Sequence, residues 1–247
     1  TGENRTSRSF VGTRLREQTE FRPKPMIPIG GRPILWHIMR SYAHHGFRRF
    51  VLCLGYKADV IKEYFLNYSS MNSDFTVSLK TDEVQVHSVD HEDDWDVTLA
   101  FTGESTQTGG RVAKAAQRYL NGAEYFAVTY GDGVTDVNLA DEFEFHKKHG
   151  KTGTVLGVNP PSRFGEIKLD GDTVRAFEEK PDLSSSWVNG GYFFFHKQFL
   201  DYLSTAEDCT LEKEPLVSLA NDGQLNMYKH DSFWQCMDTQ RDSDYLN

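Results

Sequence analysis

The sequence predicts one α/β domain built on a doubly wound, mostly parallel sheet with inserted antiparallel β segments. Short runs rich in β-branched and aromatic residues, such as 49–54 and 124–130, alternate with stretches of helical periodicity. Asp170 and Gly171 lie between two alternating segments, which is the strongest local signal for a β-hairpin. No internal repeat and no convincing linker divides the 247 residues, so we expect a single domain.

Helices are expected where helical periodicity lies between suitable start and stop residues. Pro33 suits the first position of a helix and Gly46 can end it, which predicts a helix across the run ILWHIMRSYAHH. A second clear helix is expected from Asn138 to His149, capped by Gly150. Further helices are predicted at 57–67, 111–120 and 214–220, and strands at 49–54, 124–130, 152–158, 190–195 and 224–230. Strands that alternate with helices in this way indicate a Rossmann-like sheet.

Two segments stand apart from this alternation. The stretches FTVSLK, EVQVHSV and DVTLAF lie between about residues 70 and 105 and predict a small antiparallel β insertion. Residues 1–10 are polar and have no period of either kind, so we expect an atypical N-terminal segment, either foreign to the natural chain or native and lacking a first strand, followed by a domain spanning 11–247. Because the chain begins with Thr1 rather than Met, we expect a processed, truncated or added start.

The composition indicates a globular protein that binds neither nucleic acid nor membrane. The formal net charge is −9 and the pI is about 5.5, so the surface repels phosphate backbones at long range. A small anionic substrate remains compatible with this charge where lysine, arginine and metal reverse it locally. The three cysteines are widely spaced and form no CxxC pair, which predicts reduced thiols in the cytoplasm. No apolar run approaches the length of a membrane span.

Two aspartates follow predicted strands and are candidate metal ligands. Asp132 belongs to the run Tyr130-Gly131-Asp132-Gly133 directly after the strand at 124–130, and Asp238 follows the β-like run FWQCM. In open α/β sheets, ligands bind at the carboxyl ends of the strands. Mg²⁺ takes one or two carboxylates and completes its octahedron with waters and substrate phosphates. The alternative is that the GDG run is merely a strand-ending turn.

Two further runs have the chemistry of a triphosphate site. Gly12 allows a backbone to approach phosphate oxygens closely, and Thr13 and Arg14 can donate hydrogen bonds to them. Lys24 lies between Pro23 and Pro25, which fix the chain on both sides of this positive charge. Taken alone, the Gly-Thr-Arg run is also compatible with an ordinary loop.

The remaining candidates suit a sugar phosphate and a base. Lys180, beside Glu179 and before Pro181, could neutralise a monophosphate, and Asn189 followed by Gly190 permits close approach and hydrogen bonds to a sugar. The run from Thr108 through Gly110 to Arg111 opens a helix whose backbone could contact the edge of a base. Each of these pieces separately also fits a hairpin end, a turn or a helix N-cap.

Taken together and in order, these motifs resemble the sugar-phosphate nucleotidyltransferases, and within them the cytidylyltransferases that act on glucose 1-phosphate. The resemblance extends from about Val11 to Asn247. It depends on the runs GTRLREQT, RPKPMIPIGGRPILWHIM, GYKADVIKEYF, WDVTLAFTG, TGGR, TYGDGV, FEEKP, NGGYFF, EPL and FWQCMDTQRD.

The resemblance implies a reaction in which glucose 1-phosphate attacks the α-phosphorus of CTP, giving CDP-glucose and pyrophosphate. Asp132 and Asp238 would hold Mg²⁺, Arg14 and Lys24 would face the CTP phosphates, and Lys180 would bind the sugar phosphate. Glu179 and Asn189, with Gly190, would hold the sugar, while Thr108, Gly110 and Arg111 would face cytosine and ribose. Gly12, Thr13, Tyr130 and Gly131 complete the expected substrate-binding set. The resemblance also implies a homo-oligomer and a product used for bacterial surface polysaccharide such as O-antigen.

The base and the activity are the two points at which alternatives remain open. TGGR and the inserted β segment resemble the cytidylyl branch, so we expect a strong preference for CTP over UTP and dTTP. The family has two glycines where Ser9 and Phe10 stand here, and a phenylalanine ring would obstruct a backbone that cradles phosphate. A nucleotidyltransferase with another nucleotide or hexose phosphate, and a catalytically impaired relative that binds a nucleotide sugar, therefore remain alternatives.

Overall fold

The central sheet combines parallel and antiparallel strands. The computed structural model describes residues 21–87, 94–159, 166–178 and 187–247. The sheet has the strand order β13 (Leu225–His230), β9 (Gly153–Val158), β12 (Val188–His196) and β7 (Tyr125–Thr129). β13 runs parallel to β9, whereas β12 is antiparallel to both of its neighbours. A second parallel pair joins β3 (Arg49–Leu54) to β6 (Asp96–Phe101). The α/β class with inserted antiparallel segments is confirmed.

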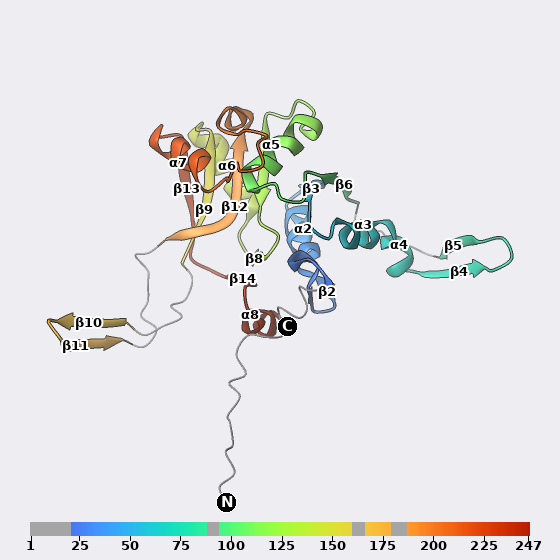
Figure 1. Cartoon of the computed structure of the whole chain (residues 1–247), viewed down its shortest axis with the longest axis horizontal. Helices are drawn as coiled ribbons and strands as arrows, with labels where there is room; N and C mark the ends of the chain where they lie inside the picture. The colour runs from blue at the N-terminus through green and yellow to red at the C-terminus, as the bar shows by residue number, and fades with distance from the viewer. Residues whose placement is uncertain (1–20, 88–93, 160–165, 179–186) are drawn as a thin grey trace, which may run out of the picture.

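Helices cover both faces of the central sheet (Figure 1). One face packs against α2 (Ile34–His44) and α6 (Leu139–His149), and the other packs against the 3₁₀ helix η2 (Lys197–Tyr202) and α7 (Glu214–Asn221). The remaining helical segments are η1 (Lys24–Met26), α3 (Ala58–Leu66), α4 (Tyr68–Met71), α5 (Thr108–Tyr119) and α8 (Gln240–Leu246). Among the described residues, no helix has the length and apolar character needed to cross a membrane.

Strand β12 joins the two halves of the core because both of its faces are buried. Tyr192 and Phe194 pack against the α2 and α6 side of the sheet, and Phe193 and Phe195 pack against the η2 and α7 side. All four side chains are at most 1% exposed. Successive side chains of a strand point to opposite faces of the sheet. Because both faces are buried here, every one of these positions is apolar, and the strand is a continuous aromatic run.

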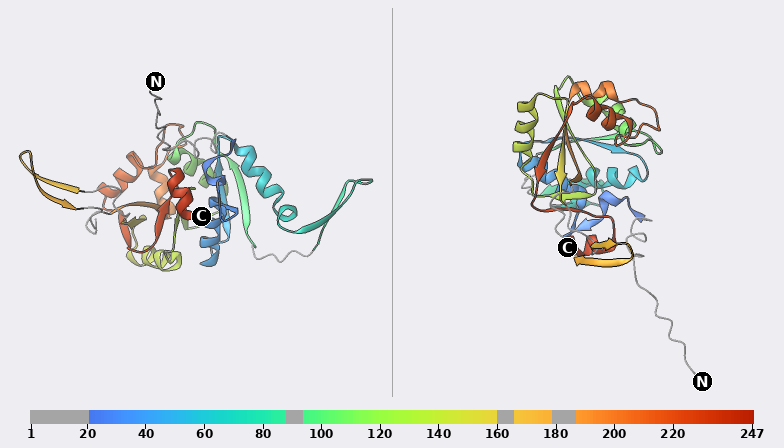
Figure 2. Two further views of the ribbon diagram at one scale, coloured as in Figure 1. Left: turned by 90° about the horizontal axis from the view of Figure 1, so that it is seen from below. Right: turned by 90° about the vertical axis from the view of Figure 1, so that its left-hand side faces the viewer.

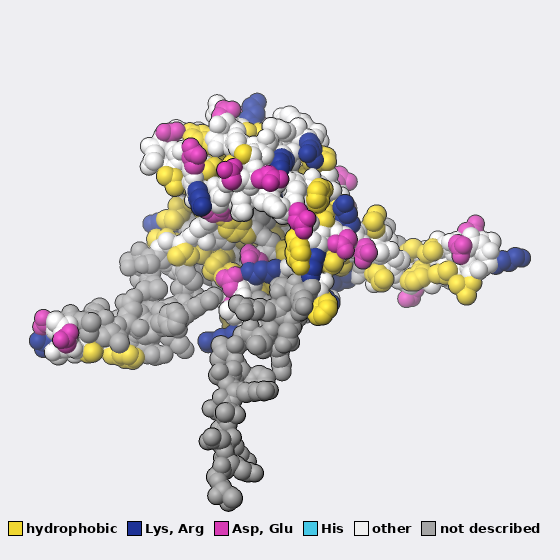
Figure 3. Space-filling view, in the orientation of Figure 1, with side chains coloured by type: hydrophobic (Ala, Val, Ile, Leu, Met, Phe, Trp, Pro, Cys, Tyr) yellow, Lys and Arg dark blue, Asp and Glu magenta, His cyan; other side chains and the backbone are white. Residues whose placement is uncertain are grey.

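Two hairpins project from opposite sides of this body (Figures 1 and 2). One consists of β4 (Asp74–Ser78) and β5 (Glu83–His87), and the other of β10 (Glu166–Asp170) and β11 (Thr173–Glu178). The second hairpin turns at Gly171, which has a positive φ of 57°, as the Asp-Gly signal predicts. Apolar side chains follow the β4–β5 hairpin (Figure 3), where Phe75, Val77 and Val84 are exposed.

Two strand predictions need correction. The run DVTLAF is not part of the antiparallel insertion, because it forms β6 and pairs in parallel with β3. Strand β3 was expected to be buried, but Val51 in its centre is 38% exposed. Among the described residues, β3 is hydrogen-bonded to a neighbouring strand on one side alone. The short pairs β1 (Pro28–Ile29) with β2 (Arg32–Pro33), and β8 (Gly133–Thr135) with β14 (Trp234–Cys236), complete the fold.

Helix α6 carries a fully buried carboxyl group into the core. Asn138 caps the helix by accepting hydrogen bonds from the backbone of Ala140 and Asp141, and Gly150 ends it with a positive φ of 66°. Glu142, in the first turn, is 0% exposed, and within the described part of the chain neither of its carboxylate oxygens has a hydrogen-bond partner. This burial raises the pKa of Glu142 from 4.5 to about 8.

Glu142 is therefore expected to make the protein less stable as the pH rises from 4.5 to about 8. In this interval the unfolded chain is ionised at Glu142, whereas the folded chain still holds the proton, so unfolding releases a proton. Glu142→Gln removes the titration, and its stability relative to the wild type should increase steadily between pH 5 and pH 8. Urea midpoints measured across this range test the prediction. Glu144→Gln, at an exposed carboxylate of the same helix, is the control. A parallel pH dependence in wild type and Glu142→Gln would contradict the prediction.

Candidate active site

The pairing of β8 with β14 brings Asp132 and Asp238 side by side. Asp132 directly precedes β8, and Asp238 follows β14 after one residue. The two strands are antiparallel with Cys236 opposite Gly133, and the Met237 N–H donates to the Asp132 carbonyl over 2.8 Å. The two carboxylates are distant in sequence, and they lie side by side because the antiparallel pairing places the start of β8 beside the end of β14.

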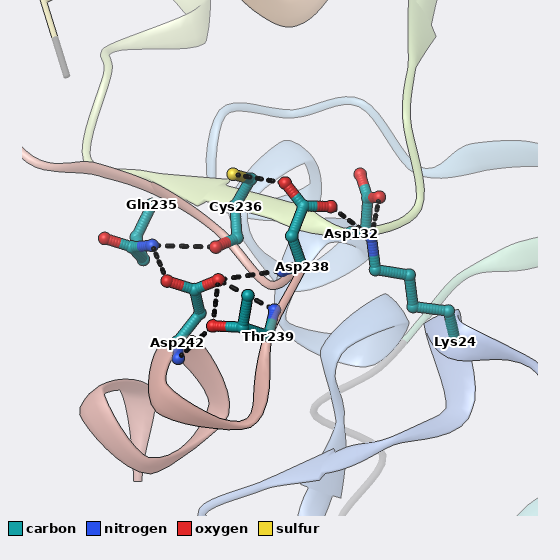
Figure 4. Close-up of polar contacts among 7 residues, drawn as sticks. All are labelled: Lys24, Asp132, Gln235, Cys236, Asp238, Thr239 and Asp242. Atoms are coloured by element: carbon teal, nitrogen blue, oxygen red, sulfur yellow. Dashed lines mark hydrogen bonds and ion pairs between the residues drawn. The ribbon is translucent and has the colours of Figure 1, made fainter. Parts of the chain in front are cut away.

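Lys24 reaches between the two carboxylates (Figure 4). Its Nζ lies 2.7 Å from Asp132 Oδ2 and 2.7 Å from Asp238 Oδ1. The two carboxylate oxygens are therefore no more than twice that distance apart. Burial lowers the pKa of Lys24, but the hydrogen bonds and charges of Asp132 and Asp238 outweigh it and leave the pKa raised. Lys24 is thus a stable cation at this point.

A tight contact between two loops fixes the lysine. Lys24 begins η1 and lies between Pro23 and Pro25, which restrict the backbone on both sides of it. A Cβ added at Gly131 would lie 2.8 Å from the Pro25 side chain, so glycine allows the loop that carries Asp132 to approach η1 this closely. Gly131, expected to bind substrate, has this packing contact with Pro25 in the described structure.

The position of Lys24 Nζ is suited to a divalent cation. Mg²⁺ binds oxygen at about 2.1 Å, so each carboxylate would need to move by roughly 0.6 Å to share an ion at that point. The described residues contain no group of three or more potential metal-ligating side chains. Asp132 and Asp238 would hold Mg²⁺ alone, with waters and substrate phosphates as the remaining ligands.

A hydrogen-bond network holds the backbone at Asp238 and so orients its carboxylate (Figure 4). Asp242 Oδ2 accepts hydrogen bonds from the backbone N–H groups of Asp238 (3.1 Å) and Thr239 (2.8 Å), and from the Thr239 hydroxyl (2.9 Å). Thr239 and Asp242 form the capping box of α8. Gln235 Nε2 donates to the other Asp242 oxygen, and Cys236 Sγ lies 3.2 Å from Asp238 Oδ2. The start of a helix therefore fixes the second carboxylate.

A pocket of about 210 Å³ opens beside the two aspartates. It is lined by Tyr130, Asp132, Gly133, Asn189, Gly190, Gly191, Tyr192, Trp234, Cys236 and Asp238. The structure thus brings together the predicted residues Tyr130, Asn189 and Gly190 with both aspartates. The lining residues outside the predicted set are Gly133, Gly191, Tyr192, Trp234 and Cys236. Trp234 Nε1 donates to the Gly190 carbonyl over 2.8 Å and so ties β14 to β12.

The residues expected to face the base lie at the start of α5 and have structural contacts there. Arg111 donates to the carbonyls of Leu54 (3.0 Å) and Glu104 (3.1 Å), and to the Thr102 hydroxyl. Gly110 is buried, and a Cβ on it would lie 2.4 Å from the Ala206 carbonyl. Thr108 Oγ1 donates to Glu212 over 2.8 Å.

Five predicted site residues lie outside the described residues. They are Gly12, Thr13, Arg14, Glu179 and Lys180. The proposed contacts of the CTP triphosphate and the sugar phosphate with these residues therefore stay predictions. Asp132, Asp238 and Lys24 are the predicted catalytic residues that the structure describes, and they meet at one point.

The fold and this site define a nucleotidyltransferase, and the comparisons agree. The pattern of the Nucleotidyl transferase family matches residues 11–242, so the chain belongs to this family. Solved structures with the same fold include HddC from Yersinia pseudotuberculosis, with a TM-score of 0.64 and 21% identity, covering 95% of this chain and 93% of that one. A putative glucose-1-phosphate thymidylyltransferase from Bacillus anthracis has a TM-score of 0.64 and 15% identity, covering 96% and 90%.

Relatives within the family are more similar in sequence. The chain is 45% identical over 236 residues to a glucose-1-phosphate cytidylyltransferase from Salmonella typhi, covering 96% of this chain and 91% of that protein. It is 40% identical to a probable glucose-1-phosphate cytidylyltransferase from Bacillus subtilis (strain 168), covering 92% and 88%. The resemblance inferred from short motifs is therefore confirmed across nearly the whole chain.

Proposed function

We propose that this protein transfers the cytidylyl group of CTP to glucose 1-phosphate in a Mg²⁺-dependent reaction, giving CDP-glucose and pyrophosphate. The observation that carries the proposal is the convergence of Asp132, Asp238 and Lys24 within a protein 45% identical to a glucose-1-phosphate cytidylyltransferase. In-line attack of a sugar phosphate on the α-phosphorus needs positioning and charge stabilisation rather than covalent catalysis by the protein. One ammonium, and two carboxylates that would hold Mg²⁺, at the adjoining ends of β8 and β14 would supply these.

Each residue has a distinct role in this proposal. Asp132 and Asp238 would hold a Mg²⁺ ion, which would neutralise phosphate charge and orient the two substrates. Lys24 then contacts the α-phosphate of CTP together with Arg14, while Gly12 and Thr13 approach the triphosphate from the backbone. Lys180 and Glu179 hold the sugar phosphate and the sugar with Asn189. Thr108, Gly110 and Arg111 face cytosine and ribose from the start of α5.

The proposal extends to assembly and cellular context. The apolar face of the β4–β5 hairpin includes Phe75, Val77 and Val84, and Leu79 in the turn that follows β4 is 90% exposed. A two-stranded hairpin is marginally stable in water, so covering this face by a second copy of the chain would stabilise it. We therefore propose a homo-oligomer. Three free cysteines suit a cytoplasmic enzyme, and CDP-glucose would supply deoxysugars of surface polysaccharide.

A panel of nucleotides and sugar phosphates tests the proposed function. Pyrophosphate release with Mg²⁺ and glucose 1-phosphate should be faster with CTP than with UTP or dTTP by roughly tenfold or more, which corresponds to about 1.4 kcal/mol. Comparable turnover with dTTP would contradict the cytidylyl assignment, and faster turnover with another hexose 1-phosphate would contradict the sugar.

One sequence feature favours a second candidate function. Ser9 and Phe10 stand where the resemblance to the family implies the two glycines of the phosphate loop, which suits a catalytically impaired protein that binds a nucleotide sugar. In the same panel, binding of CDP-glucose without pyrophosphate release from any nucleotide would support this second candidate.

A further inference from the structure

Glu212 connects two sides of the proposed active site. It lies just before α7, in a segment of irregular structure, and its side chain is exposed. Glu212 Oε2 accepts a hydrogen bond from the hydroxyl of Thr108 over 2.8 Å, and Oε1 accepts one from the hydroxyl of Tyr130 over 2.5 Å. One carboxylate therefore joins the first residue of α5 to the residue that follows β7.

The connection continues from Tyr130 to β12. Asn189 Nδ2 donates to the Tyr130 hydroxyl over 3.3 Å, and Asn189 Oδ1 accepts from the Gly191 N–H over 2.8 Å. Gly191 has a positive φ of 78°, and a Cβ there would lie 2.6 Å from the Tyr130 ring. The ring is therefore packed against β12 while its hydroxyl points to Glu212. A continuous path of hydrogen bonds runs from α5 through Glu212 and Tyr130 to Asn189.

The end of this hydrogen-bond path at Thr108 is also fixed. The Leu211 N–H donates to the Thr108 hydroxyl over 2.9 Å, so this hydroxyl accepts from the backbone beside Glu212 and donates to its carboxylate. The Tyr130 hydroxyl likewise donates to Glu212 and accepts from Asn189 Nδ2. Both hydroxyls thus have their donor direction set by Glu212.

We propose that Glu212 is a positioning residue that couples the nucleotide side of the site to its sugar side. The inference rests on the proposed function, in which Thr108 faces the nucleotide and Asn189 faces the sugar. Tyr130 is two residues from Asp132, so fixing Tyr130 also fixes the loop that carries this aspartate. A substrate that orders Thr108 would order Tyr130 and Asn189 through Glu212, and each substrate would strengthen binding of the other.

Steady-state kinetics of Glu212→Ala, Tyr130→Phe and the double variant test this coupling. In the wild type, the KM for each substrate should fall as the other approaches saturation. In Glu212→Ala both KM values should rise roughly threefold to tenfold, since two hydrogen bonds to a charged group are lost at an exposed position, and the mutual dependence should disappear. The double variant should be no worse than the poorer single variant, because both substitutions interrupt one path. Glu212→Gln, which retains one acceptor, should restore part of the effect.

Glu214→Ala is the matched control, because it removes an exposed carboxylate two residues further along and should change neither KM. In one contrary outcome, the KM would rise for glucose 1-phosphate alone, with the effects of the two substitutions adding up in the double variant. This result would overturn the proposal, because it would mean that Glu212 contacts the sugar directly. Unchanged KM values with a lowered melting temperature would overturn it in favour of a purely structural role.

Calorimetric binding of CDP-glucose gives a readout that does not require turnover. Glu212→Ala should weaken this binding roughly tenfold, since CDP-glucose spans both sides of the site. Unchanged affinity would contradict the inference even in an inactive protein. A wild type that releases pyrophosphate from no nucleotide contradicts the proposed function itself, whereas an active wild type with an indistinguishable Glu212→Ala variant contradicts the inference alone.

Discussion

Replacing Asp132 by Asn is expected to reduce turnover roughly a thousandfold while leaving the fold intact. The substitution keeps the size of the side chain but removes one of the two charges that would hold Mg²⁺. Stabilisation of transferred phosphate by a bound metal is worth several kcal/mol, and about 4 kcal/mol corresponds to a thousandfold in rate. The side chain is about one-third exposed, so the structure should tolerate the change.

The measurement for Asp132→Asn is pyrophosphate release as a function of Mg²⁺ concentration. The residual activity should no longer respond to added Mg²⁺ in the range that saturates the wild type. Asp201→Asn, which neutralises an exposed aspartate in η2 on another part of the surface, controls for the change in net charge. Mg²⁺-stimulated turnover at the wild-type level in Asp132→Asn would exclude this residue from the site.

Replacing Lys24 by Met is expected to have opposite effects on metal binding and on turnover. In the described structure the ammonium lies where an ion between Asp132 and Asp238 would lie, so Lys24 and the metal compete for the two carboxylates. Ion pairs between side chains about one-third to one-half exposed contribute about 1 kcal/mol, so loss of this competitor should tighten Mn²⁺ binding without substrate by roughly fivefold. Turnover should fall by roughly a hundredfold, because the cation expected at the α-phosphate is lost.

Mn²⁺ titration by electron paramagnetic resonance, together with kinetics, tests the Lys24 prediction. Lys148→Met removes an exposed lysine in the last turn of α6 and is the control for lost positive charge. Weaker Mn²⁺ binding in Lys24→Met would mean that the lysine supports the metal site rather than competing with it. Unchanged turnover would exclude Lys24 from contact with the nucleotide.

Local signals in the sequence were sufficient to predict those elements whose structure depends on local interactions. Asn138 and Gly150 predicted both ends of α6 because capping and a left-handed glycine act within one turn of a helix. The Asp170–Gly171 pair predicted the β10–β11 hairpin for the same reason. The run DVTLAF has the same alternation as the hairpin strands, and its pairing with β3 depends on residues far away in sequence. Alternation alone could not identify its partner.

The candidate site was also predictable from local sequence signals in part, whereas the rest of it depends on tertiary contacts. Asp132 and Asp238 were candidates because each follows a strand-like run, but their convergence depends on the antiparallel pairing of β8 with β14. The position of Lys24 between them depends on the close packing of Pro25 against Gly131, which no short motif encodes. Glu212 has no signal of its own, since it lies in an irregular segment and reaches Thr108 and Tyr130 through tertiary contacts.

The most direct test of the metal site is a crystal of the protein soaked with Mn²⁺ and CTP, examined by anomalous diffraction. The account predicts one anomalous peak between the two aspartates, about 2.1 Å from an oxygen of Asp132 and an oxygen of Asp238, with Lys24 displaced toward the phosphates. A fully occupied peak coordinated by phosphates and by neither aspartate would contradict it.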